Sequence, residues 1–291
     1  IIMNLEKLRS ADNIMIIGHK NPDTDSCLAS VLVSNILNKM NIKATYGIWE
    51  DDILSQQTKK MVSDVTSYKP VILKRKEKRK YHYFLVDHND VKQSINDETL
   101  VIGAIDHHLK CSNFNNAVIK NLVSTTVVIY QLFKDTYNFS ENEKKMILMA
   151  AADDSAFGRS SRYNQESKDL ILSLSNKTDF DEYFKKYFRE TDMSDLLFAF
   201  NNVRYKKYKF EKIEFESTGL EMLSDDYLDR YKEFILNSDR NFLGVYLNYK
   251  DNKTYAYFKF NNKFYEKKYD MLASRGSLII ADALKMIESD D

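Results

Sequence analysis

The order of apolar and polar positions divides the first two thirds of the chain into short strands and longer helices. Four apolar runs have the length of buried strands: 13–18, 43–47, 83–86 and 100–105. Apolar residues at intervals of three and four, the spacing of a helix, recur in three longer stretches: 25–40, 124–133 and 141–152. Strands that alternate with helices form βαβ units, so this pattern predicts a mostly parallel sheet covered by helices.

The pattern changes near residue 190. Helical spacing at 180–188 and 194–201 leads into an alternating run at 206–216, which predicts one strand. The other expected elements are a helix near 225–236, strands at 243–249 and 254–260, and a last helix at 278–287. We therefore expect an α/β protein with two domains, a mostly parallel N-terminal domain at 1–190 and a smaller α/β domain at 197–291.

Composition narrows the class of protein. Hydrophobic residues make up 43% of the 291 residues, which is enough for packed cores. Lysine plus arginine equals aspartate plus glutamate, 43 each, so no overall charge attracts nucleic acid or an anionic membrane. We expect no membrane span and no signal peptide. The two cysteines, Cys27 and Cys111, form no disulfide framework, which favours a cytoplasmic location.

Aspartate and histidine gather in four short segments that each follow or end an apolar run. These segments are GHKNPDTDS at 18–26, FLVDHND at 84–90, VIGAIDHHLK at 101–110 and ILMAAADDSAFG at 147–158. They contain four of the five histidines in the chain. In open parallel sheets ligands bind beyond the carboxyl ends of the strands, so segments that are distant in sequence can meet there.

The residue types in these segments suit one kind of chemistry. Imidazoles and carboxylates without thiolates bind Mn²⁺, Co²⁺ or Mg²⁺. Several aspartates in one place would repel one another and become protonated unless cations separate them. Two divalent ions about 3.5–4 Å apart can hold a shared water and turn it into a hydroxide for in-line attack. The segments therefore predict a hydrolase site for phosphoesters or phosphoanhydrides.

Each segment taken alone has a simpler interpretation. His19 could mark the entry to a helix, and Asp23 and Asp25 could cap the helix that begins near residue 25. Asp153 and Asp154 could end a helix, although carboxylates at a helix C-terminus oppose its dipole. The simpler interpretation requires a separate coincidence for each segment, so we favour a shared metal site.

Taken in order, GHKNPDTDS, LVDHND and IDHH resemble the motifs of the DHH phosphoesterases. Within them the motifs are most like those of the manganese-dependent, family II inorganic pyrophosphatases. The resemblance extends through STTVVIYQLF at 124–133 and DDSAFGRS at 153–160, and so covers most of the first 170 residues. It implies a DHH domain, a second DHHA2-like domain that closes over the substrate, two Mn²⁺ (or Co²⁺ or Mg²⁺), and a homodimer.

The resemblance also implies which residues bind metal. One ion would be held by His19, Asp23 and Asp87, and the other by Asp25, Asp87, His107 and Asp154, so that Asp87 bridges the two ions. Asp154 matches the family's aspartate better than Asp153 because it precedes the small hydroxyl residue Ser155.

Three histidine and asparagine positions beside these ligands are given other roles. His108 is expected to donate to the phosphate or to the leaving oxygen instead of binding a metal. His88 and Asn89 are candidates for orienting Asp87 or the attacking water.

The C-terminal part departs from the family pattern. ASRGSLII at 273–280 keeps Ser274 and Arg275 but has Gly276 where the family has a lysine. Arg275 can still bind phosphate through two donors. A further lysine of the family lies on a strand ahead of this motif. We assign it to Lys212, with Lys207 and Lys209 as alternatives. Either another basic residue replaces the lost lysine, or the substrate is not plain pyrophosphate.

The resulting hypothesis is an inorganic diphosphatase that hydrolyses pyrophosphate to two phosphates, with His108, Arg275 and Lys212 around the substrate. Gly276 keeps a second hypothesis open, a related hydrolase for short polyphosphate or a nucleotide-derived phosphoester. A third is a non-catalytic, phosphate-binding regulator. We expect a small-molecule substrate and neither nucleic acid nor membrane as a partner.

Overall fold

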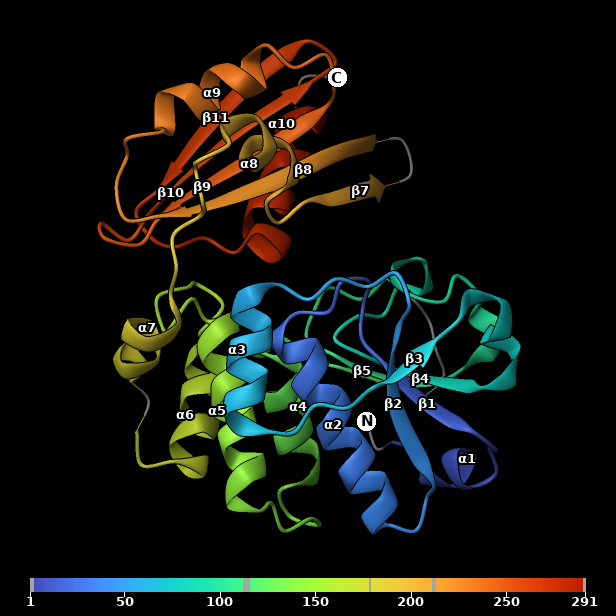
Figure 1. Cartoon of the computed structure of the whole chain (residues 1–291). Coiled ribbons are helices and arrows are strands. Elements are labelled where there is room, and N and C mark those ends of the chain that lie inside the picture. Colours follow the sequence, from blue (N-terminus) through green and yellow to red (C-terminus); the bar gives the residue numbers. More distant parts are fainter. Residues whose placement is uncertain (1–2, 112–115, 178, 211–212, 290–291) are drawn as a thin grey trace. The chain divides into compact units, whose positions relative to one another are not determined.

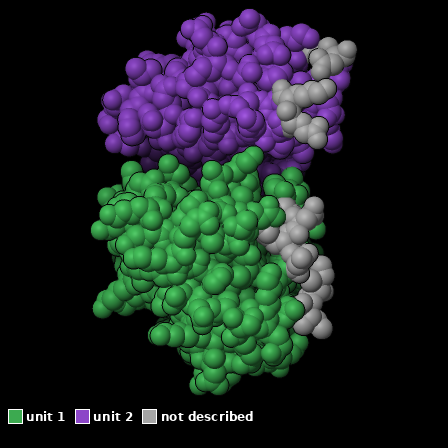
Figure 2. Space-filling view, turned by 90° about the vertical axis from the view of Figure 1, so that its right-hand side faces the viewer, with its two compact units in different colours: residues 1–158, 163–187 green, residues 159–162, 188–291 purple. Residues whose placement is uncertain are grey.

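The computed structural model describes residues 3–111, 116–177, 179–210 and 213–289. The chain divides into two compact units (Figure 2). Unit 1 contains residues 1–158 and 163–187, and unit 2 contains residues 159–162 and 188–291.

Unit 1 is built on a six-stranded, fully parallel sheet with the strand order β3-β2-β1-β4-β5-β6. The strands are β1 (Ile14–Ile17), β2 (Ala44–Trp49), β3 (Val71–Leu73), β4 (His82–Val86), β5 (Val101–Asp106) and β6 (Ala117–Ile119). All of β1 and the last four residues of β4 are buried. Uninterrupted apolar strands are typical of a parallel sheet that is covered on both faces, which places β1 and β4 at its centre.

The helices of unit 1 begin at polar caps. They are α1 (Leu5–Arg9), α2 (Thr24–Lys39), α3 (Gln56–Val65), α4 (Thr125–Phe133), α5 (Glu141–Asp154), α6 (Gln165–Leu174) and α7 (Asp181–Tyr187), with 3₁₀ turns η1 (Arg75–Lys80), η2 (Val91–Gln93) and η3 (Glu98–Leu100). The side chains of Asp23 and Ser124 cap α2 and α4, and Ser140 forms a capping box with Glu143 at α5. The first turns of α2 and α4 are therefore fixed by side chains close to the predicted site.

Unit 2 contains a five-stranded mixed sheet with the order β11-β10-β9-β8-β7, in which only β8 and β9 are parallel. Its strands are β7 (Lys206–Phe210), β8 (Ile213–Met222), β9 (Phe242–Asn248), β10 (Lys253–Phe260) and β11 (Lys263–Tyr269). Its helices are α8 (Leu196–Asn202), α9 (Leu228–Leu236), the short π-helix η4 (Arg275–Ile279) and α10 (Ile280–Glu288).

Two separate apolar clusters hold the helices of unit 2 to its sheet. Phe200 of α8 and Ile235 of α9 belong to one cluster with Leu220 of β8. Ile280 and Ile287 of α10 belong to the other cluster with strand residues that include Phe215 of β8. Because neighbouring residues of a strand point to opposite faces, α8 and α9 cover one face of the sheet and α10 covers the other (Figure 1).

The structure confirms the predicted α/β class, with a mostly parallel sheet in unit 1 and a second α/β sheet in unit 2. The predicted single strand at 206–216 is wrong. Its two halves are the antiparallel strands β7 and β8, whose pairing ends at Phe210 opposite Ile213. In the sequence, the two consecutive polar residues Glu211 and Lys212 shift the alternation by one position, a break that marks two strands better than one.

Among the described residues, no helix is both long enough and apolar enough to span a bilayer.

Candidate metal centre

The predicted metal-binding residues of unit 1 lie where three central strands end. His19 follows β1, Asp87 comes directly after β4, and His107 comes directly after β5. Asp23 and Asp25 stand at the beginning of α2, and Asp154 is the last residue of α5. Parallel strands direct their carboxyl ends to one edge of the sheet, so residues up to 135 positions apart in sequence meet there.

The first group of possible ligands consists of His19, Asp23 and Asp87, whose ligand atoms all lie within 4.8 Å of one another. The Nε2 atom of His19 is 3.5 Å from Oδ2 of Asp23 and 3.4 Å from Oδ2 of Asp87. These separations are too long for strong hydrogen bonds and leave a gap that a cation can fill.

The second group, within the same limit, consists of Asp25, Asp87, His107 and Asp154. The Nε2 atom of His107 is 3.2 Å from Oδ1 of Asp87 and 3.4 Å from Oδ2 of Asp154. Asp87 thus takes part in both groups, with Oδ2 toward His19 and Oδ1 toward His107. A carboxylate that offers one oxygen to each of two groups has the arrangement of a bridging ligand.

The orientation of the imidazole rings fits metal binding. Nδ1 of His19 lies 2.9 Å from the carbonyl oxygen of Lys20, and Nδ1 of His107 lies 3.1 Å from that of Leu122. A carbonyl can only accept, so each Nδ1 carries a proton and donates it. In the neutral ring Nε2 then presents a lone pair to the carboxylates, and Nε2 of His19 is buried without a hydrogen-bond partner among the described residues. Such rings suit a divalent ion.

The pKa values of these side chains also favour a bound cation. Burial raises the pKa of Asp25, and the nearby charge of Asp87 raises it further, to about 7. Burial opposes the charged form of His19, but the carboxylates of Asp23 and Asp87 outweigh it and raise the pKa of that ring. These side chains therefore favour added positive charge, because they gather more negative charge than their surroundings compensate. Divalent cations would supply that charge.

Asp87 is held rigidly in place. Burial alone would raise its pKa, but the rings of His107 and His19 hold the pKa well below its usual range. Ser26 donates its hydroxyl to Oδ2 at 2.6 Å, and Thr125 donates its hydroxyl to Oδ1 at 3.3 Å. The backbone of Asp87 has a φ of 61°, in the left-handed region that a residue with a Cβ seldom adopts. The chain changes direction at this residue, where β4 ends. The hydrogen bonds from Ser26 of α2 and Thr125 of α4 hold the Asp87 side chain in this position.

Asp25 ties α2 to α4. Its Oδ2 accepts from the backbone N–H of Thr125 at 2.7 Å, and its Oδ1 accepts from that of Thr126 at 3.0 Å. These N–H groups belong to the first turn of α4, where no partner within the helix exists for them. Asp25 therefore has one lone pair of each oxygen engaged and the others left for a metal.

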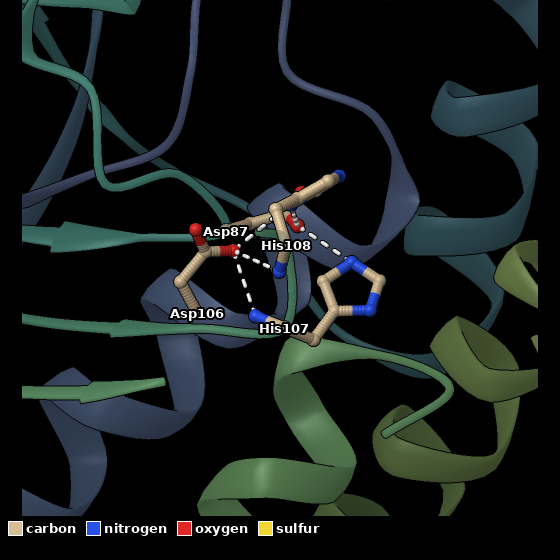
Figure 3. Close-up of side chains that lie close together, drawn as sticks. All are labelled: Asp87, Asp106, His107 and His108. Atoms are coloured by element: carbon tan, nitrogen blue, oxygen red, sulfur yellow. Dashed lines mark hydrogen bonds and ion pairs between the residues drawn. The ribbon is translucent and has the colours of Figure 1, made fainter. Parts of the chain in front are cut away.

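The sequence analysis missed Asp106, the aspartate of the IDHH motif. Its Oδ1 accepts from the backbone N–H groups of His107 and His108, at 2.7 and 3.1 Å, and from Nδ1 of His108 at 2.9 Å (Figure 3). Its Oδ2 accepts from Asn89 at 2.6 Å. Burial favours the neutral acid, but the hydrogen bond from His108 outweighs it and brings the pKa of Asp106 to about 2. The sequence did contain a sign of this role, since Asp106 is the one carboxyl residue at the end of the otherwise apolar strand β5.

His108 is positioned by Asp106. Because Nδ1 donates to Asp106, Nε2 is the ring atom that remains for another partner. Burial, and then the neighbouring His107, lower the pKa of His108.

His88 and Asn89 contact groups other than Asp87, and an orienting role toward the attacking water stays a prediction. His88 contacts the carbonyl oxygen of Val86 at 2.8 Å and the hydroxyl of Ser94 at 2.7 Å. Asn89 contacts Asp106 and the loop beyond His108, with Oδ1 accepting from the N–H of Cys111 at 2.5 Å. In the described part of the chain neither residue hydrogen bonds to Asp87. Asn89 hydrogen bonds to Asp106, Leu109 and Cys111, and these contacts direct its amide away from Asp87.

Arg275 of unit 2 lies at the beginning of η4. Its Nη1 donates to the carbonyl oxygen of Arg204 at 2.7 Å and to the hydroxyl of Ser217 at 3.3 Å. Among the described residues it forms no ion pair with a carboxylate. Burial, followed by the charge of Arg204, lowers its pKa.

The candidate lysines are placed differently. Lys212 lies outside the described residues. Lys207 and Lys209 both pair with Glu214, at 2.5 and 3.7 Å. Lys206, which the sequence analysis did not consider, lies opposite Ser217 in the β7–β8 register and so shares a face of the sheet with the Arg275 contact.

Comparison with known proteins identifies the family of the first unit. A sequence model described as the DHH family, N-terminal domain, matches residues 13–158. A manganese-dependent inorganic pyrophosphatase of Methanothrix thermoacetophila is 33% identical over 100 residues, which is 34% of this chain and 31% of that protein. A probable manganese-dependent inorganic pyrophosphatase of Lactobacillus johnsonii is 24% identical over 192 residues, which is 62% of this chain and 61% of that protein. The chain thus matches less than two thirds of the length of these curated relatives.

Solved structures show the same fold. A Methanococcus jannaschii protein, provisionally described as a family II inorganic pyrophosphatase, superposes with a TM-score of 0.70 at 17% identity, over 92% of this chain and 97% of that one. An exopolyphosphatase-related protein of Bacteroides fragilis gives 0.51 at 18% identity, over 87% and 81%. With the match at 13–158, which spans just over half of the 291 residues, these findings show that the chain belongs to the DHH family.

Proposed function

We propose that the chain is a metal-dependent inorganic diphosphatase, which hydrolyses pyrophosphate to two phosphates. The observation that carries this proposal is the pair of ligand groups that share Asp87, one group on each of its oxygens. Two ions held in this way would lie side by side, as in two-metal phosphoryl hydrolases. The curated relatives named as manganese-dependent pyrophosphatases support Mn²⁺ and this substrate.

The proposed roles of the residues begin with metal binding. His19, Asp23 and Asp87 would hold one Mn²⁺, and Asp25, Asp87, His107 and Asp154 would hold the other. When bound, the ions supply a water of lowered pKa and neutralise phosphate oxygens.

Around the ions, His108 presents Nε2 to a phosphate or leaving oxygen, and Asp106 fixes the ring by its hydrogen bond to Nδ1. Arg275 binds phosphate oxygens with its guanidinium. A lysine of the β7–β8 region assists it. Lys212 is the candidate from the motif, and Lys206 is the candidate from the strand register.

The alternative substrates are short polyphosphates and nucleotide-derived phosphoesters. Gly276 supports them, because a glycine beside Arg275 leaves space for a larger group. The alternative of a non-catalytic regulator is less favoured, since such a protein has no need of an intact set of metal ligands. A homodimer and a cytoplasmic location, implied by the resemblance and by the two cysteines, belong to the same proposal and are tested by light scattering and by cell fractionation.

The test is phosphate release from pyrophosphate, tripolyphosphate and a dinucleotide, each with Mn²⁺, Co²⁺ and Mg²⁺. We expect the highest kcat/KM for pyrophosphate with Mn²⁺. Turnover of tripolyphosphate or the dinucleotide without turnover of pyrophosphate would show that pyrophosphate is not the substrate. If none of the three compounds is hydrolysed, the hypothesis of a non-catalytic regulator is favoured.

A further inference from the structure

A short piece of chain from the middle of the sequence belongs to unit 2. Residues 159–162 pack with residues 272–274, although the chain on both sides of them is part of unit 1. Ser160 pairs with Leu272 in a parallel bridge, and the N–H of Ser161 donates to the carbonyl oxygen of Leu272 at 3.1 Å. The N–H of Ser274 donates to the hydroxyl of Ser161 at 3.4 Å. These contacts carry Arg162 to the turn at which η4 begins.

The guanidinium of Arg162 lies beside Ser274 and Gly276. Its Nη2 donates to the hydroxyl of Ser274 at 3.1 Å. The same atom is 3.5 Å from the position that a Cβ on Gly276 would take, and it is the nearest atom to that position. The φ of Gly276 is outside the left-handed region, so the backbone there does not require glycine. What the glycine provides is room, and the guanidinium of Arg162 lies next to it.

Both Arg162 and Arg275 therefore adjoin the turn of residues 274–276, Arg162 through its guanidinium and Arg275 through its own backbone. Arg275 lies between Ser274, which binds Arg162, and Gly276, which leaves room for it. The Arg275 side chain is partly buried and, in the described part of the chain, forms no ion pair with a carboxylate. A partly buried cation that lacks an anionic partner is costly, and the nearby charge of Arg204 adds repulsion. An anion bound at this turn removes both costs. Phosphate matches guanidinium groups well, because each can donate two parallel hydrogen bonds to it.

We propose that Arg162 is a phosphate-binding residue of this enzyme and that, with Arg275, it holds a phosphate group of the substrate at the turn of residues 274–276. This inference rests on the proposed function and adds a residue to it. It also answers the question raised by Gly276, since the cation missing at that position is supplied by a segment 114 residues earlier in the sequence.

The test measures binding of imidodiphosphate, a pyrophosphate analogue that resists hydrolysis, by isothermal titration calorimetry to the full chain loaded with Mn²⁺. We expect Arg162→Ala to raise Kd by about 10- to 100-fold, the range of a lost charge-assisted hydrogen bond. Arg162→Lys keeps the charge but loses the paired donors of the guanidinium. We expect its Kd to lie between that of the wild-type chain and that of Arg162→Ala. Arg230→Ala removes an exposed arginine of α9 and is the matched control, with no expected change.

A rescue variant guards against loss of folding. Adding Gly276→Lys to Arg162→Ala returns a cation to the same place, and we expect it to recover at least half of the lost binding free energy while thermal unfolding stays cooperative. An unchanged Kd in Arg162→Ala overturns the inference, as does an equal loss in Arg230→Ala or a wild-type chain that does not bind the analogue.

The two proposals can fail separately. A wild-type chain that binds imidodiphosphate through Arg162 but releases no phosphate from pyrophosphate refutes the diphosphatase assignment and supports the phosphate site. If the Arg162→Ala variant turns over pyrophosphate with an unchanged KM and an unchanged Kd for the analogue, the diphosphatase assignment is supported and the phosphate site at Arg162 is refuted.

Discussion

The Nε2 atom of His107 lies 3.2 Å from Oδ1 of Asp87, while the other oxygen of the same carboxylate faces His19. One buried side chain thus connects two groups of predicted ligands that come from different strands and helices. Loss of its charge affects both groups together, whereas loss of any other predicted ligand affects one.

Asp87→Asn is therefore expected to reduce both metal content and activity. We expect kcat to fall at least about 100-fold, the scale of losing one group that stabilises charge in a transition state. Mass spectrometry of bound metal should show fewer than two Mn²⁺ per chain. Asp135→Asn, at an exposed position after α4, is the control and should change neither quantity. A fully active Asp87→Asn with two bound ions would remove the bridging role.

Asp106→Asn separates orientation from metal binding. The amide can no longer offer two anionic oxygens to His108 and Asn89, so the His108 ring loses its fixed direction. We expect kcat to fall about 10- to 100-fold, as is common for partners of catalytic groups, with KM and metal content nearly unchanged. The acidic limb of the pH–rate profile should shift at the same time. Loss of both ions in this variant would instead make Asp106 a ligand.

Glu143 gives a stability prediction that is independent of the metal centre. Burial favours its neutral form, but hydrogen bonds from Ser140, Tyr137 and Asn35 outweigh it and lower its pKa. A carboxyl whose folded pKa is depressed stabilises the fold above its unfolded pKa of about 4.3, and that stability is lost as the pH falls through the folded pKa.

Glu143→Gln should therefore lower the free energy of unfolding by about 1 kcal/mol near pH 7, the usual value of a lost helix cap, and by less below about pH 4. Urea unfolding at several pH values measures the difference. Glu141→Gln, on the exposed side of the same helix turn, is the control and should show little change at any pH. A difference from wild type that does not depend on pH would contradict the assigned role of the carboxylate.

Lys206 and Lys207 provide a test of strand register. Lys206 lies opposite Ser217, which contacts Arg275, whereas Lys207 points to the other face and pairs with Glu214. We expect Lys206→Ala to raise KM for pyrophosphate about 3- to 10-fold, the worth of one exposed charge-assisted contact, and Lys207→Ala to leave it unchanged. The opposite result would place the substrate on the other face of β7.

Much of unit 1 could be predicted from the sequence because its central strands are buried on both sides. Such strands are short, uninterrupted apolar runs, and β1 and β4 stand out for this reason. The strands β3 and β6 have three residues each and lie at the two ends of the sheet, so they are too short to produce a pattern. Apolar and polar residues alternate both before and after 211–212, and the one-position shift between the two runs was overlooked, which is why β7 and β8 were joined.

The meeting of His19, Asp87 and His107 could be anticipated because strand ends in a parallel sheet share an edge. That they bind metal remains a prediction. Asp106 was overlooked because its role depends on four hydrogen bonds that only the folded turn creates. Arg162 was overlooked for a related reason, since its contact with Ser274 joins positions 112 residues apart and no local pattern marks such a pair.

The return of residues 159–162 to unit 2 has a practical consequence for dissecting this protein. A gene fragment that begins at residue 188 would encode the whole five-stranded sheet but would omit the strand partner of Leu272 and the arginine next to Gly276. Conversely, a fragment that ends at residue 187 would carry those four residues with nothing to dock against. The two units are thus not separable by a single cut, and any chimera or truncation that treats them as consecutive modules divides one of them.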